Sequence, residues 1–243
     1  MIFHHRQRRN IPTLKLLIDG KEIKQCFEFK LLGLTITNNL DWSKHINRIS
    51  NKISQTIGIM SRIKRYVPRG ALLHIYNSLI LSRIYYCILL WGFDSRRLEK
   101  LQKKAIRVIC NSKYNAHTLP LFQDLRLLKI KNIFEIQCAK FFYKFEHNTL
   151  PGYFDSFFQT NADLHNHNTR HRGDLHLHQY RLHSTGKCIR FHIPNYINNL
   201  PANIRSKFET HSLKGLTQYM KNHIIKDYDR ICHKDKCYIC GRN

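Results

Sequence analysis

The chain has 243 residues, of which 42% are hydrophobic and 12% aromatic, enough for a buried core in one large domain or two small ones. This composition excludes a wholly disordered chain. Lysine and arginine number 41 against 16 aspartate and glutamate residues, a formal net charge of +25, so folding works against self-repulsion unless an anionic partner neutralises it. A nucleic acid is the leading candidate for that partner, and an acidic membrane surface is the alternative.

The sequence argues against a membrane-spanning helix and against secretion. No window of about twenty residues is free of ionisable or amide side chains, as a spanning helix would require. Residues 1–12 form a basic tail, in which Arg6, Arg8 and Arg9 are not followed by the apolar segment of a secretory signal. We therefore expect an intracellular protein, nuclear or cytoplasmic, without a membrane partner.

Residues 13–42 have the signals of a small antiparallel β unit. Apolar residues alternate up to Asp19-Gly20, a dipeptide that favours a tight hairpin turn, and a strand resumes over residues 23–27. A third run, residues 29–36, predicts one further strand. Because a unit of this size is not stable alone, we expect it to pack on the rest of the chain.

Residues 43–150 have the period of helices, which predicts a mainly α protein built on a helical bundle. Ser43 is predicted to cap a helix whose apolar residues, from Ile46 to Ile63, fall within one stripe about 100° wide. A second helix, residues 70–91, is apolar on nearly all sides, and its interrupting polar residues favour the centre of a bundle over a membrane span. The face of the first helix opposite its apolar stripe carries Lys44, Arg48, Lys52 and Arg62.

The predicted helix at residues 96–110 separates apolar from basic residues most sharply. Glu99 is the only acidic residue available to pair with its cations. The uncompensated charge therefore favours a phosphate-binding face over a merely solvated one. The cations of this face are Arg97, Lys100, Lys103, Lys104 and Arg107.

Residues 151–226 are predicted to form a His-rich loop and a C-terminal helical region. A helix at residues 132–147 precedes them, and the last amphipathic helix is predicted over residues 213–228. Six histidines lie between His165 and His183 without a recognised metal-ligand spacing, which favours a solvated loop over a metal site.

The tail, residues 227–243, contains a possible zinc half-site. Cys237 and Cys240 have the two-residue spacer that lets both thiolates reach one tetrahedral ion, and Cys232 precedes them. A fourth ligand would be His233, His223 or water. The alternative is an exposed tail without metal.

No complete catalytic site is visible in the sequence. Polymerases and nucleases gather two or three carboxylates around Mg²⁺, yet the chain has no Asp-Asp pair, and its aspartates stand alone beside turns or helix starts. It contains no P-loop, no G-x-G-x-x-G and no G-x-S-x-G. No cofactor is therefore assigned to this chain apart from the zinc considered for the tail.

Several short motifs follow one another along the chain. They are Phe29-Lys30-Leu31-Leu32-Gly33-Leu34, Leu40-Asp41-Trp42 with His45-Ile46, Tyr76-Asn77-Ser78-Leu79-Ile80, Tyr85-Tyr86 with Trp91, Leu98 to Arg107 (L-x-x-L-Q-x-x-A-I-R), His117 to Phe122, Leu150 to Phe154, His167-Asn168-Thr169-Arg170 and Asn198-Asn199-Leu200-Pro201. Their order resembles the region after the catalytic core of reverse transcriptases from non-LTR retrotransposons of the jockey and CR1-like kind. The last motif departs from the family pattern, since Ile197 stands where the family has tryptophan.

The resemblance implies the C-terminal part of an RNA-directed DNA polymerase. Residues 13–42 would be the end of the palm, residues 43–150 a thumb lying along the template and primer backbone, and the following residues the C-terminal region. In the family, the Y-A-D-D hairpin and its Mg²⁺ lie before the motif that contains Lys30, so this chain is expected to be a truncated fragment without the catalytic site. Lys30 joins the expected nucleic-acid-binding residues.

Two alternatives stay open at the sequence level. The chain could be a freestanding basic helical protein that binds RNA or DNA, or an interaction module built on a zinc-binding tail. The reverse-transcriptase fragment and the freestanding nucleic-acid-binding protein both predict phosphate contacts with weak sequence preference. The zinc-binding module does not. The oligomeric state is open in each case.

Overall fold

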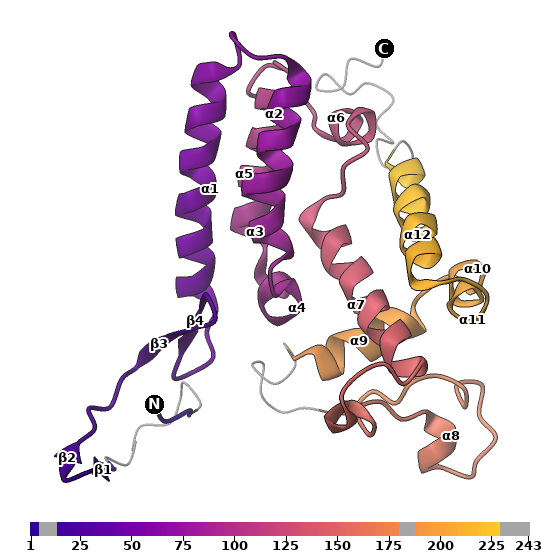
Figure 1. Cartoon of the computed structure of the whole chain (residues 1–243). Coiled ribbons are helices and arrows are strands. Elements are labelled where there is room, and N and C mark those ends of the chain that lie inside the picture. Colours follow the sequence, from indigo (N-terminus) through magenta and orange to yellow (C-terminus); the bar gives the residue numbers. More distant parts are fainter. Residues whose placement is uncertain (5–13, 180–187, 229–243) are drawn as a thin grey trace.

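The computed structural model describes residues 1–4, 14–179 and 188–228, and it confirms a mainly helical fold with a small antiparallel β unit at the N-terminus (Figure 1). The β unit consists of two hairpins, β1 (Leu17–Ile18) with β2 (Lys21–Glu22), and β3 (Glu28–Leu31) with β4 (Leu34–Thr37). The first turns at Asp19 and Gly20, whose φ angles of 49° and 75° suit the predicted tight turn.

The run at residues 29–36 is a hairpin, which corrects the prediction of a single strand. It reverses at Leu32 and Gly33, with φ angles of 46° and 86°. The reason is tertiary: the Tyr86 hydroxyl donates a hydrogen bond to the Leu32 carbonyl, and a Cβ at Gly33 would lie 3.6 Å from the Tyr86 ring. A leucine in a left-handed conformation is uncommon, and here this distant contact holds it.

Helix α1 (Ser43–Ile63) begins where predicted, but Ser43 does not cap it. Instead the Asp41 carboxylate accepts hydrogen bonds from the Ser43 backbone N–H, at 2.9 Å, and from its hydroxyl, at 3.0 Å. Ile53, Ile57 and Met60 are fully buried on the apolar stripe, as the 3.6-residue period predicts. The β unit joins this helix through β4, whose Leu34, Thr35 and Thr37 are buried.

The predicted central helix at residues 70–91 is broken, which corrects a second expectation. It comprises α2 (Arg69–Ile75), a π-helical segment η1 (Tyr76–Leu81) and α3 (Ser82–Tyr85), and after a left-handed Cys87 it continues as α4 (Ile88–Trp91). Within the described residues no single helix has the length and hydropathy of a membrane span; the segments Arg69–Tyr85 and Ile88–Asp94 reach them only together, and they are bent by 59°.

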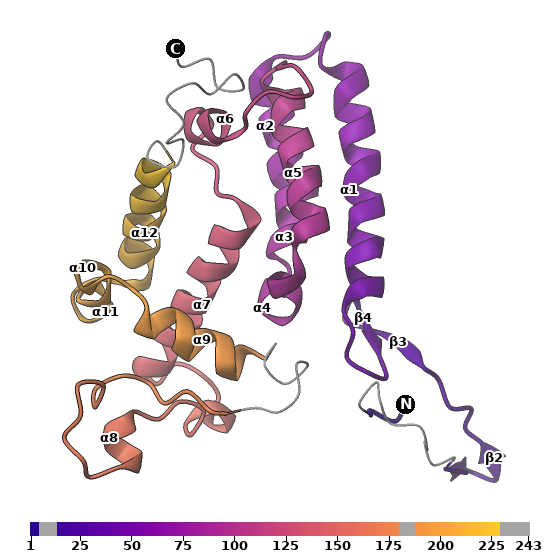
Figure 2. The same cartoon turned by 180° about the vertical axis from the view of Figure 1, so that it is seen from behind.

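The helices after the break complete one continuous core. A 3-10 turn, η2 (Gly92–Asp94), leads into α5 (Arg96–Ile109), which packs beside α1 (Figures 1 and 2). The other elements are α6 (Leu119–Asp124), α7 (Ile130–Glu146), the 3-10 turn η3 (Gly152–Phe154), α8 (Asn161–Leu164), α9 (Ile189–Asn198), α10 (Ala202–Arg205), α11 (Lys207–Thr210) and α12 (Leu213–Asp227). Helices α9 and α12 both pack on α7.

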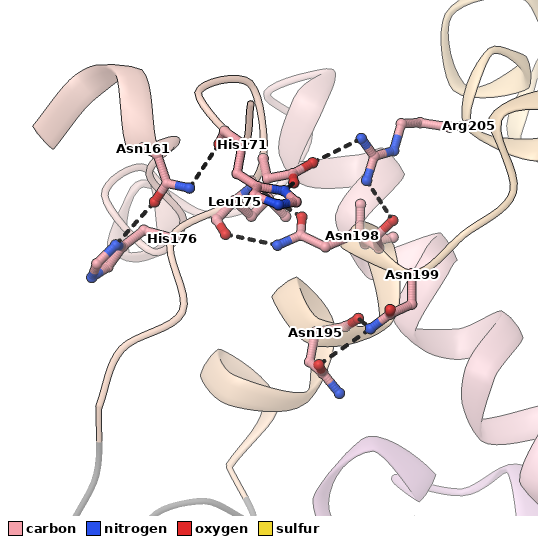
Figure 3. Close-up of polar contacts among 10 residues, drawn as sticks. Asn161, His171, Leu175, His176, Asn195, Asn198, Asn199 and Arg205 are labelled. Carbon is pink, nitrogen blue, oxygen red and sulfur yellow. Dashed lines mark hydrogen bonds and ion pairs between the residues drawn. The ribbon is translucent and has the colours of Figure 1, made fainter. Parts of the chain in front are cut away.

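Two polar clamps attach the described part of the His-rich segment, residues 165–179, to α9 and α10 (Figure 3). The Asn198 amide donates to the Leu175 carbonyl at 2.8 Å and accepts from the Leu175 N–H at 3.0 Å, as a neighbouring strand would. Arg205 donates to the Asp174 carboxylate at 3.1 Å and to the Ile197 carbonyl at 3.0 Å.

Candidate nucleic-acid interface

Helices α1 and α5 lie parallel and side by side (Figures 1 and 2), and they carry all of the predicted cations except Lys30. A hydrogen bond from Arg97 to Asn47 joins their first turns. A second one, from Lys64 Nζ to Asn111 Oδ1 at 2.9 Å, joins the residues that follow their last turns. These two bonds connect the helices near both ends of α5.

The α1 side of this pair contains no acidic residue. All four predicted cations, Lys44, Arg48, Lys52 and Arg62, are exposed. Lys44 is paired with Glu28 of β3 at 2.6 Å, and this contact lowers the pKa of the Glu28 carboxyl, first through the hydrogen bond and then through the charge of Lys44. Lys44 therefore also ties the β unit to the helix.

The α5 side carries more charge. Arg97, Lys100, Lys103 and Lys104 are exposed, and Arg107 is half-buried. The single acid of this helix, Glu99, accepts a hydrogen bond from Ser95 Oγ at 2.9 Å. The opposite face is buried and consists of Leu98, Gln102, Ala105, Ile106 and Ile109.

Some of the predicted cations have intramolecular roles in addition to charge. Arg97 bonds to Asn47, and Arg107 Nε donates to the Ala116 carbonyl at 2.9 Å, which holds the loop after α5. Lys30 lies on β3 opposite Thr35, in the hairpin at the N-terminal end of α1 and not on the surface of the two helices. Eight predicted cations are exposed and form no ion pair within the described residues: Lys30, Arg48, Lys52, Arg62, Arg97, Lys100, Lys103 and Lys104.

The structure adds three basic residues that the sequence analysis did not select. Arg96 is exposed one turn before Lys100, a spacing that could have been noticed in the sequence. His117 and Lys129 come from other segments. The pKa of His117 is lowered by burial and then by the charges of Lys129, Lys103 and Arg107, and burial followed by Lys103 lowers the pKa of Lys129. The C-terminal half of α5 is therefore a region of like-charge repulsion.

The metal hypotheses receive no support from the described residues. Among them, no three or more His, Cys, Asp or Glu side chains are grouped so that they could hold a metal ion. The proposed ligands Cys232, Cys237, Cys240 and His233 lie outside the described residues, as does His183. His223 lies in α12, with Nδ1 3.5 Å from an Asp227 carboxylate oxygen.

Two histidines of the His-rich segment have structural partners instead (Figure 3). His171 Nδ1 lies 2.7 Å from the Asp174 carboxylate, and the pKa of Asp174 is lowered first by this hydrogen bond and also by Arg205. His176 Nδ1 lies 3.2 Å from Asn161 Oδ1, and the same Asn161 amide donates to the His171 carbonyl at 2.8 Å. These contacts shape the loop.

A comparison with curated proteins found the RNA-directed DNA polymerase from mobile element jockey of Drosophila melanogaster, 23% identical over 120 residues. This match supports a relationship to non-LTR reverse transcriptases. It covers 46% of this chain and 13% of the relative, so the chain spans a small part of that polymerase. No family model matches the chain, and no solved structure matches it.

Proposed function

We propose that this chain is the C-terminal part of a jockey-like or CR1-like non-LTR reverse transcriptase and that it binds the phosphates of RNA or DNA on α1 and α5. In this proposal, residues 13–42 correspond to the end of the palm, residues 43–150 to the thumb and the later residues to the C-terminal region. The chain holds template or primer in place and does not itself carry the polymerase centre.

The observation that carries this proposal is the parallel pair of basic helices. Ten cations lie on α1 and α5 against the single acid Glu99, and most of these cations are exposed. A merely solvated surface gains nothing from so much uncompensated charge. A nucleic acid that releases its counterions on binding gains affinity from each lysine or arginine that contacts a phosphate.

The lowered pKa values of His117 and Lys129 support the same proposal. In the free protein, burial and then the charges of Lys129, Lys103 and Arg107 lower the pKa of His117, and burial and then the charge of Lys103 lower the pKa of Lys129. An anion bound beside them would relieve this repulsion, because an opposite charge nearby favours the charged form of each group. The same basic groups that disfavour each other's charge in the free chain would therefore attract a phosphate.

The absence of a Y-x-D-D motif or any other Asp-Asp pair from the sequence limits the proposal to binding. Mg²⁺ would belong to the intact family enzyme, whose catalytic carboxylates would lie outside this chain.

Substitution of Lys100, Lys103 and Lys104 by glutamine tests the interface. We expect weaker binding of a single-stranded oligonucleotide and a slope of log K against log salt that is shallower by about 2 to 3, about 0.7 to 0.9 for each lost phosphate contact. Arg107 is left intact, because its bond to Ala116 would confound the result. Fluorescence anisotropy over a salt series measures both quantities.

The matched control removes three exposed lysines from other helices, Lys144, Lys214 and Lys226. This control has the same net charge as the test variant, so it separates a local contact from general electrostatic attraction. A test variant with an unchanged slope, or with the same slope as the control, would show that the α5 face is only solvated.

A further inference from the structure

A cavity of about 400 Å³ opens where the start of α5 meets α7 and α9. Its apolar part is aromatic. The Phe93 and His192 rings stack with centroids 5.7 Å apart and an interplanar angle of 10°, and the Phe134 ring stands at 86° to His192 with centroids 5.8 Å apart. Three flat rings from η2, α7 and α9 thus form part of one cavity.

The rest of the lining is polar and of mixed charge. Arg96 and Lys131 supply cations, and Asn195 and Asn199 supply amide groups that both donate and accept hydrogen bonds. Glu99 and Glu135 also line the cavity. Such a lining fits a planar ligand whose edge carries hydrogen-bond donors and acceptors better than a hydrocarbon.

One buried side-chain polar atom among the cavity-lining residues lacks a partner. His192 Nε2 is buried and has no hydrogen-bond partner in the described part of the chain, and an unpartnered buried polar atom is costly. Burial lowers the pKa of His192, so its neutral ring has one nitrogen that donates and one that accepts. A ligand with polar edges could satisfy this atom.

The cavity wall is closely fitted. A Cβ at Gly92 would lie 2.6 Å from the Phe134 ring and 2.7 Å from Ile88, so only glycine lets η2 approach α7 so closely. Gly92 thereby sets the position of the neighbouring Phe93 against α7.

The cavity is continuous with the basic face of α5. Arg96, Lys100, Lys103 and Arg107 follow one another at spacings of four, three and four residues, which places them along one side of the helix. Arg96 lines the cavity, so this row of cations begins at its rim. A nucleic-acid strand whose phosphates contact this row of cations has one end at the aromatic rings of the cavity.

We propose that this cavity binds one unpaired nucleobase of the strand whose phosphates contact α5. The proposal rests on the function proposed above and extends it, because it adds a contact to a base where phosphates alone were expected. Stacking on aromatic rings tolerates any base, so the contact favours single-stranded over double-stranded nucleic acid without reading sequence.

The test compares two single-stranded oligonucleotides of about ten nucleotides, a length within the usual site size. One is oligothymidylate, and the other has the same sugar-phosphate backbone with every base removed, so the two differ in bases and not in charge. The full chain should bind oligothymidylate about 5-fold to 100-fold more tightly, as expected for one stacked base. Anisotropy competition measures the ratio.

Two variants test whether the cavity causes the preference for the strand that carries bases. Phe93→Leu keeps an apolar wall but removes a ring, and Asn195→Leu removes a polar amide of the cavity lining at an exposed position, where folding is least affected. Each should reduce the preference for bases severalfold without changing affinity for the abasic strand. Phe29→Leu, the same substitution at an exposed phenylalanine of β3, and Asn203→Leu, at an exposed asparagine of α10, should behave as the unmodified chain.

Four outcomes would overturn the proposal. Equal affinity for both oligonucleotides would reject the base pocket and leave phosphate binding intact. A preference that both cavity variants retain would place the base contact elsewhere. Displacement of the oligonucleotide by an equal concentration of thymidine monophosphate would assign the cavity to free nucleotides. Failure to bind either oligonucleotide would reject the interface and the pocket together.

Discussion

At the residue scale, Gln102 shows how a polar side chain organises the core. It is 1% exposed, and its amide nitrogen donates to the Tyr76 hydroxyl and to the Leu128 carbonyl, each at 2.9 Å. Its amide oxygen accepts a hydrogen bond, at 3.1 Å, from the backbone N–H of Ile130, which is the first residue of α7. Since Lys129 supplies no side-chain cap, Gln102 satisfies this helix start from α5.

We therefore predict that Gln102→Leu lowers the free energy of unfolding by about 2 to 4 kcal/mol. The volume is nearly kept, but the Tyr76 hydroxyl, the Leu128 carbonyl and the Ile130 N–H would be left buried without partners. Urea unfolding followed by circular dichroism measures the loss. The same change at the exposed Gln55 of α1 should cost less than about 0.5 kcal/mol. Equal losses in the two variants would contradict the role of Gln102.

At the element scale, the joint between the β unit and the helices depends on His45. Its Nδ1 accepts a hydrogen bond from the Thr35 N–H at 3.2 Å, which requires the unprotonated nitrogen. The ring is 2% exposed and lies between Trp42 and Trp91, with centroids 6.1 Å from each. Burial, and then the charge of Arg48, lower the pKa of His45.

This geometry predicts that the fold loses stability as the pH falls below about 6.5, the ordinary pKa of histidine. Below that pH the unfolded chain binds a proton at His45 that the folded chain does not, so the free energy of unfolding decreases until the folded-state pKa is passed. His45→Gln should weaken this dependence, whereas His74→Gln at an exposed position of α2 should leave it unchanged. Thermal melting between pH 5 and 8 measures this dependence. Identical slopes of melting temperature against pH in the two variants would refute the prediction.

At the scale of the whole molecule, the proposed function gives this chain nucleic-acid binding and leaves the polymerase chemistry to carboxylates outside it. The basic pair α1 and α5 forms one side of the described molecule, and the C-terminal helices cover the other side of α7 (Figure 2). The N-terminal hairpins leave large apolar side chains exposed, among them Leu16, Ile18, Phe27 and Leu32, while Ile36 is half-buried. Nothing in this arrangement gathers carboxylates for Mg²⁺ in the described residues.

We therefore expect no primer extension by the purified chain with Mg²⁺, deoxynucleotides and a primed RNA template, because a polymerase needs paired metal-binding carboxylates. Binding of the same primed template, measured in parallel, would show that the preparation is folded. Extension that co-purifies with the chain and disappears on chelation of Mg²⁺ would contradict the proposed separation.

Local sequence patterns were enough to predict the elements that depend on near neighbours. The period of Ile46 to Ile63 predicts α1, the charge separation of residues 96–110 predicts α5, and Asp19-Gly20 predicts its hairpin. These succeed because helix periodicity and turn conformation are set within a few residues. The exposed positions of Lys100, Lys103 and Lys104 follow from the same periodicity.

Contacts between distant residues were decided only by the tertiary structure. Leu32 turns because Tyr86 bonds to its carbonyl, Gln102 is buried because Tyr76, Leu128 and Ile130 converge on it, and Asn198 clamps Leu175 across the His-rich segment. The aromatic cavity at Phe93 likewise needs α7 and α9 to meet η2. The physical reason is that a local pattern states which side of an element is apolar, whereas the choice among buried polar partners depends on which elements pack together.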